Sequence, residues 1–392
     1  MKNYSHKGRM GVCIELKNDN YGSMLQSYAT QHMLNDYGID YDLLIYKKKY
    51  TPIFLLKSLP RGLNYVLLHE IQAMLSKKAF LRRHPELSNA VQKRKKAFAQ
   101  FREKFFCAPK QIFVGYNALK EGALQYNSFL SGSDQMWSPV GLPSNFYNLM
   151  FTPNKVTRIS YASSFGVKQI PWFQITRTKK YLRRIEHISC RENSGRDIIK
   201  KLIQREVPVV VDPTLLFTGA QWLKMLPTEK KYGDKYIFSY LLGPDPSTRQ
   251  EVKKLKNITG LPIVSIHQYL EADLDFGDIS VEDAGPAEFV ALINNATYIC
   301  TDSFHGSVFS ILLHKQFIVF NRYKEKDKSS KNTRIESLCK NLGLEKRRFS
   351  GDIGKDIFEE IDYGKVDCKV DELRQYSYKY LENAFDSIKD IK

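Results

Sequence analysis

The polar hexapeptide "TDSFHG", Thr301 to Gly306, contains the leading candidate for acid–base chemistry in this chain. It stands between "ATYIC" and "SVFSILLHK", two apolar segments that predict a strand and a helix. In an open parallel sheet, the turn after a strand lies at the edge where ligands bind. Histidine titrates near neutral pH, so we expect His305 to transfer protons there. The alternative is that its ring only braces the turn through a backbone carbonyl.

Four polar or small residues around His305 each have two interpretations. Asp302 either orients and charge-stabilises the imidazole or caps the following helix. Gly306 and Ser307 begin that helix, and its free N–H groups suit a phosphate or carboxylate. Gly306 is otherwise explained by close packing of the helix on a strand. Ser303 either adds a hydroxyl donor to the anion site or closes the turn.

A second candidate for anion binding is Arg191, which follows the predicted strand "HISC". Its planar guanidinium can hold a phosphate or carboxylate through two parallel hydrogen bonds. The alternative is an ion pair with Glu192 or another acid. Further along, "VPVVVDPTLLF" predicts a β run closed by Asp212 and Pro213.

For these turns to form one site, a sheet must hold them at the same edge. Patterns typical of strands and helices do alternate along the chain. The pattern predicts an α/β fold with two doubly wound Rossmann-like domains facing across a cleft. We assign the N-terminal α/β domain to residues 1–205, with a basic helical insert at about 50–110. The C-terminal α/β domain covers 206–370. Residues 371–392 form a last helix, which we expect to pack back on the N-terminal domain.

The insert carries much of the formal net charge of +18. Residues 47–110 hold 16 Lys and Arg against 3 Glu, interleaved with Leu, Ile and Phe. Basic and apolar residues together favour peripheral contact with an anionic membrane over nucleic-acid binding. The alternative is a solvated basic face on an ordinary helical hairpin.

Sequence features also indicate the compartment. No apolar run approaches the ~18 residues that span a bilayer, and the N-terminus does not resemble a signal peptide. The six cysteines are scattered without a C-x-x-C pair. We therefore expect reduced thiols in a cytoplasmic protein, with membrane contact limited to the inner face. The histidines lack paired ligand spacing, so no metal site is predicted.

Six blocks, in order along the chain, resemble the polysaccharide pyruvyl transferase family. They are "NYGSMLQSYA" (20–29), "GSDQMWSP" (132–139), "RISYASSFG" (158–166), "ISCRENSG" (188–195), "VDPTLLF" (211–217) and "TDSFHGSVFSILLHKQF" (301–317). "TRIESL" (333–338) and the last helix add to the resemblance.

The resemblance implies a fold like that of the B-type glycosyltransferases, with the active site between the domains. It also implies transfer of a pyruvyl group from phosphoenolpyruvate to sugar hydroxyls of a bacterial surface polysaccharide or its lipid-linked precursor. That reaction needs an acid, a base and groups that hold phosphate and carboxylate, but no cofactor. Some relatives have Arg at the position of Ser303, which makes Arg191 the preferred donor anchor here.

The acceptor side of such a site is expected in two N-terminal turns. Asp134 is the candidate base for the sugar hydroxyl, with Gln135 beside it and Trp137 placed to stack on a sugar ring. Asp and Ser are also common in such turns for conformational reasons alone. The other turn contributes "NYG", Asn20 to Gly22, which is too short for a dinucleotide fingerprint. Asn20 is alternatively a helix cap.

Two other functions fit the same scaffold. One is a glycosyltransferase that uses a nucleotide sugar, and the other is a non-catalytic saccharide-binding protein. The sequence leaves the acceptor sugar and the oligomeric state open.

Overall fold

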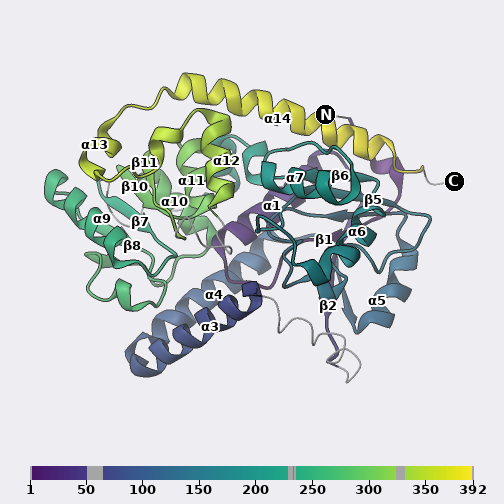
Figure 1. The fold of residues 1–392 in the computed structure, drawn as a ribbon, viewed down its shortest axis with the longest axis horizontal. Coiled ribbons are helices and arrows are strands. Elements are labelled where there is room, and N and C mark those ends of the chain that lie inside the picture. Colours follow the sequence, from purple (N-terminus) through teal and green to yellow (C-terminus); the bar gives the residue numbers. More distant parts are fainter. Residues whose placement is uncertain (1, 51–64, 228–232, 234, 324–331, 391–392) are drawn as a thin grey trace.

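Two separate parallel sheets organise the chain in the computed structural model, which describes residues 2–50, 65–227, 233, 235–323 and 332–390 (Figure 1). The first sheet has six strands in the order β3-β2-β1-β4-β5-β6. These strands are β1 (Met10–Cys13), β2 (Tyr41–Lys47), β3 (Lys110–Val114), β4 (Ser128–Ser131), β5 (Thr157–Ser163) and β6 (His187–Cys190). The helices of this half are α1 (Tyr21–Asp36), α5 (Tyr116–Gly122), α6 (Ile175–Leu182) and α7 (Asn193–Ile203).

The second sheet has five parallel strands in the order β11-β10-β7-β8-β9. These are β7 (Ile237–Tyr240), β8 (Ile263–Ser265), β9 (Ile279–Ser280), β10 (Tyr298–Thr301) and β11 (Gln316–Val319). The helices around it are α8 (Gly219–Met225), α9 (Pro246–Thr259), α10 (Pro286–Asn295), α11 (Phe304–Leu312), α12 (Thr333–Leu342) and α13 (Ile353–Phe358). Both sheets order their strands from the middle outward, so the predicted pair of doubly wound α/β domains is confirmed.

The hexapeptide forms the turn between β10 and α11, and β11 returns parallel to β10. It lies at the carboxyl end of β10, where the sequence places it. The predicted β run before Asp212 is wrong in its extent. Among the described residues it makes one isolated bridge, Cys190 to Val209, and then enters a short 3-10 turn, Pro213–Leu216. Proline has no N–H for a ladder, so strand pairing ends there and Asp212 points inward instead.

Helix α1 lies between the two halves of the molecule. Thirteen of its 16 residues are buried, including Ser27 and Thr30 on its polar side. The Thr30 hydroxyl donates to the Gln26 carbonyl at 2.8 Å, which satisfies it inside the helix. Tyr21 donates to the Ala284 carbonyl at 2.9 Å, so the start of α1 is fixed to the second domain.

The basic insert contains two helices, α3 (Tyr65–Arg83) and α4 (Ser88–Phe105), which lie along the lower edge of Figure 1. Residues 51–64 of the insert lie outside the described residues. The buried Arg94 guanidinium donates to the carbonyls of His267 (2.6 Å) and Val281 (3.2 Å) and lies 4.9 Å from the Tyr269 ring. Phe80 packs beside Tyr269 in the same small core. The insert therefore joins the first domain to the second.

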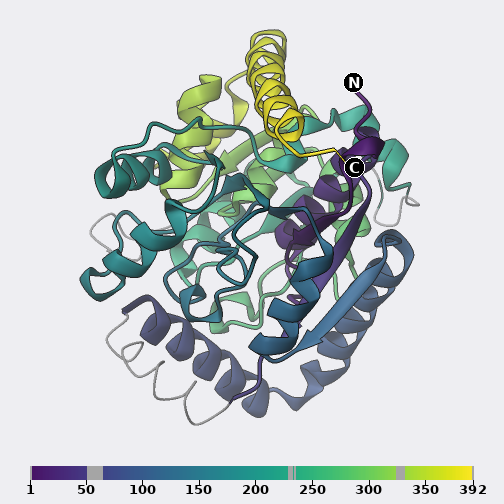
Figure 2. The same ribbon diagram turned by 90° about the vertical axis from the view of Figure 1, so that its right-hand side faces the viewer.

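On the opposite edge, α14 (Tyr363–Asp386) crosses both domains (Figure 1). Its Ser377 accepts from the Val211 N–H at 3.0 Å, and Tyr380 donates to the Ser160 carbonyl at 2.9 Å. The N-terminal segment lies beside the end of α14 (Figure 2), where Lys2 pairs with Asp386 at 2.9 Å. No helix within the described ranges is long and apolar enough to cross a membrane.

We predict that Arg94→Met loosens the insert from the second domain. The variant keeps an apolar stem but loses two hydrogen bonds from a buried cation, so the free energy of unfolding should fall by about 2 kcal/mol. Urea denaturation measures this change. The matched control is Lys93→Met, which removes only the exposed 2.9 Å pair with Glu282 and should cost less than ~1 kcal/mol. Equal effects of the two variants would contradict the anchoring role of Arg94.

Candidate active site

A cavity of about 360 Å³ lies between the two domains. The turns after β1 and β4 supply one wall, and the turn before α11 with the start of α12 supplies the other. Its polar lining residues are Asn18, Asn20, Ser23, Glu70, Asp134, Gln135, Ser138, Tyr147, Asp302, Ser303, His305, Arg322, Tyr323, Asn332 and Arg334. The cavity therefore has the size and polarity for a small polar ligand.

His305 enters this cavity from the first turn of α11. Ser303 caps the helix by accepting from the Gly306 N–H at 3.3 Å, which fixes the start of the helix. The ring packs against α1 at Gly22, where an added Cβ would lie 2.0 Å from His305 Nδ1. Only glycine leaves room for the ring there. A histidine of one domain is thus seated against the backbone of the other.

The partner of His305 is Asp212, whose Oδ2 lies 3.6 Å from Nε2. Asp212 is completely buried and also accepts from Arg191 Nη1 (2.6 Å), the Ser133 hydroxyl (3.0 Å) and the Thr214 N–H (3.0 Å). Burial alone would raise the pKa of Asp212, but His305 and Arg191 together lower it well below its usual range. Asp212 is therefore an ionised carboxylate that orients the imidazole.

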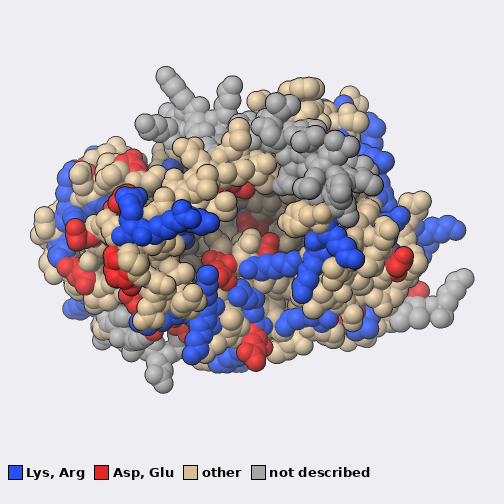
Figure 3. Space-filling view, turned by 90° about the horizontal axis from the view of Figure 1, so that it is seen from below, with Lys and Arg blue, Asp and Glu red and all other residues tan. Residues whose placement is uncertain are grey.

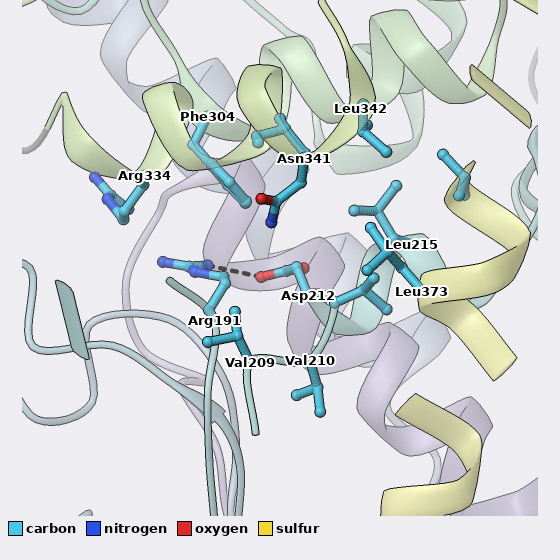
Figure 4. A pocket seen from close by; sticks show the side chains of 13 residues that line it. Arg191, Val209, Val210, Asp212, Leu215, Phe304, Arg334, Asn341, Leu342 and Leu373 are labelled. Carbon is cyan, nitrogen blue, oxygen red and sulfur yellow. Dashed lines mark hydrogen bonds and ion pairs between the residues drawn. The ribbon is translucent and has the colours of Figure 1, made fainter. Parts of the chain in front are cut away.

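Arg191 does not face the cavity, contrary to its predicted role as the donor anchor. Its side chain is 1% exposed and is surrounded by Asp212, Asp134 (3.3 Å) and Glu192 (3.8 Å). Figure 4 shows the Arg191–Asp212 pair beside the Phe304 ring, whose centroid lies 4.6 Å from the guanidinium carbon. The pocket drawn there holds about 30 Å³, room for about one water. The alternative stated for Arg191, an ion pair with Glu192 or another acid, is therefore correct. Arg191 pairs with three acids at once.

Asp134 does line the cavity, although its surroundings do not favour a general base. Its carboxylate accepts from the Ser23 hydroxyl (2.7 Å) and Arg191 (3.3 Å). Burial opposes ionisation, but Arg191, His305 and Arg334 outweigh it and lower the pKa of Asp134 to about 2. So acidic a carboxylate accepts a proton poorly at neutral pH. Its backbone φ of +73° is a strained conformation that this network holds in place.

Arg334 is the site residue that the sequence reasoning missed. It comes from the start of α12, lines the cavity and lies 3.9 Å from Asp134 Oδ1. Burial, with Arg191 nearby, lowers the pKa of its guanidinium to about 10, so it stays cationic at neutral pH. The available signal was "TRIESL" (333–338), which adds to the family resemblance and has Arg334 as its second residue.

The other predicted residues of this turn make hydrogen bonds within the protein, although Asp302 and Ser303 also line the cavity. Asp302 accepts from the N–H groups of Leu242 and Gly243, both at 2.7 Å. It does not contact His305, and the cap of α11 is Ser303. The N–H groups of Gly306 and Ser307 are already bonded to the side chain and carbonyl of Ser303. They are therefore not open to an anion, and the predicted donor-binding role for these two residues is wrong.

Gly306 instead reflects close packing. A Cβ on this residue would lie 2.5 Å from Thr301 Oγ1. This is the packing explanation that the sequence left open, and it accounts for the glycine without a ligand.

The predicted acceptor residues divide into two groups. Asn20 and Gln135 line the cavity, and Asn20 also caps α1 by accepting from the Ser23 N–H at 3.0 Å. Tyr21 lies away from the cavity, where its ring stacks on Phe289 at 4.7 Å. Trp137 is 4% exposed and packs in the core of the first domain, so its ring has no free face for a sugar.

Four side-chain atoms in this cluster are buried without a hydrogen-bond partner in the described part of the chain. They are His305 Nε2, Arg334 Nε, Arg191 Nε and Glu192 Oε2. Three of these atoms still face an opposite charge just beyond hydrogen-bond distance, since His305 Nε2 lies 3.6 Å from Asp212 and Arg191 Nε lies 3.8 Å from Glu192 Oε2. Arg334 Nε is the one that belongs to a residue lining the cavity and has no such neighbour among the described residues. The Glu192 carboxyl has a raised pKa, because burial outweighs the opposing effects of Arg191 and Ser164. No group of three or more His, Cys, Asp or Glu side chains suited to a metal occurs in the described ranges.

Several solved structures of sugar enzymes resemble this fold over nearly its whole length. The S. aureus MnaA–UDP co-structure has a TM-score of 0.50 and 10% identity, covering 98% of this chain and 99% of that chain. Methanocaldococcus jannaschii UDP-GlcNAc 2-epimerase, in complex with UDP-GlcNAc and UDP, has a TM-score of 0.47 and 13% identity over 94% and 99%. The E. coli heptosyltransferase WaaC with ADP has a TM-score of 0.40 and 11% identity over 93% and 99%. The likeness to the S. aureus MnaA–UDP co-structure shows a shared two-domain fold and nothing beyond the fold.

Sequence comparison gives the more specific result. No curated protein matches the chain. A family model described as polysaccharide pyruvyl transferase matches residues 20–323, a span that includes Asp134, Asp212 and His305. The match covers well over half of the 392 residues. This chain belongs to the polysaccharide pyruvyl transferase family.

Proposed function

We propose that this protein transfers a pyruvyl group from phosphoenolpyruvate to two hydroxyls of a saccharide, forming a cyclic ketal. The saccharide is a bacterial surface polysaccharide or its lipid-linked precursor. The observation that carries the proposal is one cavity wall that presents His305, held by Asp212, beside the Arg334 guanidinium. Family membership supports a transferase acting on polysaccharide.

The reaction defines what these groups must do. The methylene carbon of phosphoenolpyruvate gains a proton, which develops positive charge on the adjacent carbon. One sugar hydroxyl adds to that carbon. The bond between that carbon and the phosphate oxygen breaks, and a second sugar hydroxyl then adds to the same carbon and closes the ring. The two sugar hydroxyls release two protons. One replaces the proton given to the methylene carbon, which becomes a methyl group, and the other leaves with phosphate. No electron acceptor is needed.

His305 is the group that we assign to this proton transfer. Its Nε2 is buried, has no hydrogen-bond partner among the described side chains and backbone, and lies 3.6 Å from the Asp212 carboxylate. A neighbouring carboxylate fixes the ring orientation and stabilises the imidazolium that forms during proton transfer. Asp212 is itself held by Arg191 and Ser133, so the imidazole has little freedom to turn.

Arg334 and Arg322 are the cations that we assign to the donor. Both line the cavity, whereas Arg191 is enclosed by acids. Phosphoenolpyruvate carries a phosphate and a carboxylate, and a guanidinium can bind either group through two hydrogen bonds. Arg334 therefore takes the anchoring role that the sequence suggested for Arg191. Asn20 and Gln135, on the facing wall, are left for the acceptor hydroxyls.

The test of the proposal is direct. Purified protein is mixed with phosphoenolpyruvate and extracted surface glycan, and mass spectrometry follows the ketal while phosphate release is measured. Thermal-shift titrations compare phosphoenolpyruvate with a panel of nucleotide sugars, since a bound ligand raises the melting temperature. A shift with a nucleotide sugar alone would indicate a glycosyltransferase. Glycan binding without any donor effect would indicate a saccharide-binding protein.

We predict that His305→Asn lowers turnover by about 10²–10⁴-fold, the usual contribution of positioned acid–base catalysis. Asparagine keeps polarity and approximate size but cannot carry the proton. Phosphate release measures turnover, and the melting temperature and phosphoenolpyruvate affinity should change little. A variant that unfolds while its folded fraction keeps full activity would show that His305 only braces the turn.

We predict that Arg334→Lys raises the Michaelis constant for phosphoenolpyruvate about 10- to 100-fold, because one ammonium cannot replace a two-point contact. The constant for the acceptor should change much less, which initial-rate kinetics with each substrate varied can resolve. Arg348→Lys is the matched control, since Arg348 pairs with Glu336 at 3.4 Å and does not line the cavity. If both variants behave alike, Arg334 does not bind the donor.

We predict that Gly22→Ala impairs turnover through His305 without touching any charged group. Its Cβ would lie 2.0 Å from Nδ1, so the ring must move. Turnover should fall at least about tenfold, since small misplacements of a catalytic group are costly. The control is Gly364→Ala at the start of α14, where the nearest atom to a Cβ, Asp362 Oδ1, lies 3.3 Å away. Undiminished turnover in Gly22→Ala would argue against the seating of His305.

A further inference from the structure

Helix α3 exposes more apolar surface than its neighbours. Leu68, Ile71, Met74 and Leu75 are 54%, 40%, 61% and 56% exposed, respectively. At 3.6 residues per turn, these four side chains fall within an arc of about 120° on one side of the helix. Contiguous apolar surface of this kind marks an interaction site in soluble proteins. The helix touches the rest of the molecule mainly near its end, through the buried Phe80.

The same stripe changes from apolar to basic along the helix. Lys78 and Arg82 continue it at the helical spacing of Leu68, Ile71 and Leu75, and both are exposed. No ion pair with another described residue neutralises either side chain. The described part of the insert, 65–105, holds ten Lys and Arg against three Glu. An apolar stripe that ends in cations complements a surface with an apolar interior and anionic head groups.

The position of α3 relative to the cavity gives this stripe a functional meaning. Glu70, one residue before Ile71, lines the cavity between the domains. Successive helical residues project about 100° apart, so the apolar arc flanks the side of α3 that carries Glu70, and none of its four residues lines the cavity. Figure 3 looks onto the edge where α3 and α4 lie in Figure 1, and Lys and Arg side chains flank a hollow near the middle of this face. Whatever α3 contacts lies close to the active site.

We propose that α3 docks this protein on an anionic membrane surface, with the cavity facing the lipid. Leu68, Ile71 and Leu75 insert among the acyl chains near the head groups, and Lys78 and Arg82 contact lipid phosphates. The helix lies in the interface and does not cross it, because the cations Lys78 and Arg82 interrupt its apolar stripe after Leu75. A further step, which rests on the proposed function, is that the acceptor saccharide is lipid-linked and reaches the cavity from the membrane surface.

The docking test uses vesicle sedimentation with the full-length protein. We expect binding to vesicles of phosphatidylglycerol and phosphatidylcholine, little binding to phosphatidylcholine alone, and a steep loss as salt rises from 0.05 to 1 M. The triple variant Leu68→Ser, Ile71→Ser, Leu75→Ser should weaken binding at least about a hundredfold. Lys78→Glu with Arg82→Glu should weaken it by more than about tenfold. Exposed Leu124→Ser and Ile258→Ser, on other elements, are the controls and should bind normally.

Each outcome decides the docking proposal. Wild-type protein that ignores anionic vesicles, or α3 variants that bind as well as the controls, would overturn it. Self-association through this stripe would appear as a change of mass in analytical ultracentrifugation that the triple variant abolishes, and vesicle binding would then be absent. Salt-sensitive binding to RNA instead of vesicles would also overturn it.

Vesicle binding can be measured without phosphoenolpyruvate, so the docking proposal and the proposed function are tested independently. Vesicle binding without any phosphate release from phosphoenolpyruvate would contradict the pyruvyl-transfer proposal. The proposal that α3 docks on a membrane would still hold. The α3 variants should retain activity on a soluble glycan fragment and lose it on acceptor embedded in vesicles. Equal loss on both acceptors would show that α3 supports the fold of the site and is not a docking surface.

Discussion

The buried pair of Arg191 and Asp212 is the interaction on which the rest of the site depends. Their closest atoms are 2.6 Å apart and both side chains are almost fully enclosed. Moving two charges out of water costs several kcal/mol each, so such a pair is retained only when its geometry is satisfied on all sides. Here Asp134, Ser133, Thr214 and the Phe304 ring complete it. Removing either partner would leave an uncompensated charge and cost about 3–5 kcal/mol.

This pair also explains how His305 is held between the domains. Asp212 follows the first sheet and His305 starts a helix of the second, so the 3.6 Å contact joins the two halves of the molecule. Gly22 completes the seat from α1. The placement of His305 therefore depends on how α11 of the second domain packs against α1 of the first. Neither domain alone provides this contact.

Periodicity and turn location were enough to predict much of the fold. The strand, turn and helix around "TDSFHG" follow from apolar spacing alone, and parallel order then places His305 at the sheet edge. Sequence patterns fail where side chains converge from distant elements. Arg191 and Arg334 look alike as isolated arginines, and only the packed structure shows that acids enclose one while the other reaches the cavity. Trp137 likewise looks suited to a sugar until the core of the first domain covers it.

The two bridges between the domains have a consequence for how substrates are recognised. Helix α14 spans the seam on one edge of the molecule, and the Arg94 anchor of the insert closes it on the opposite edge (Figure 1). A cleft fastened at both ends has little scope for the hinge bending by which many two-domain enzymes sense their ligands. Under the proposed function, selection among acceptor saccharides would therefore depend on the shape of the opening between the domains and not on domain closure.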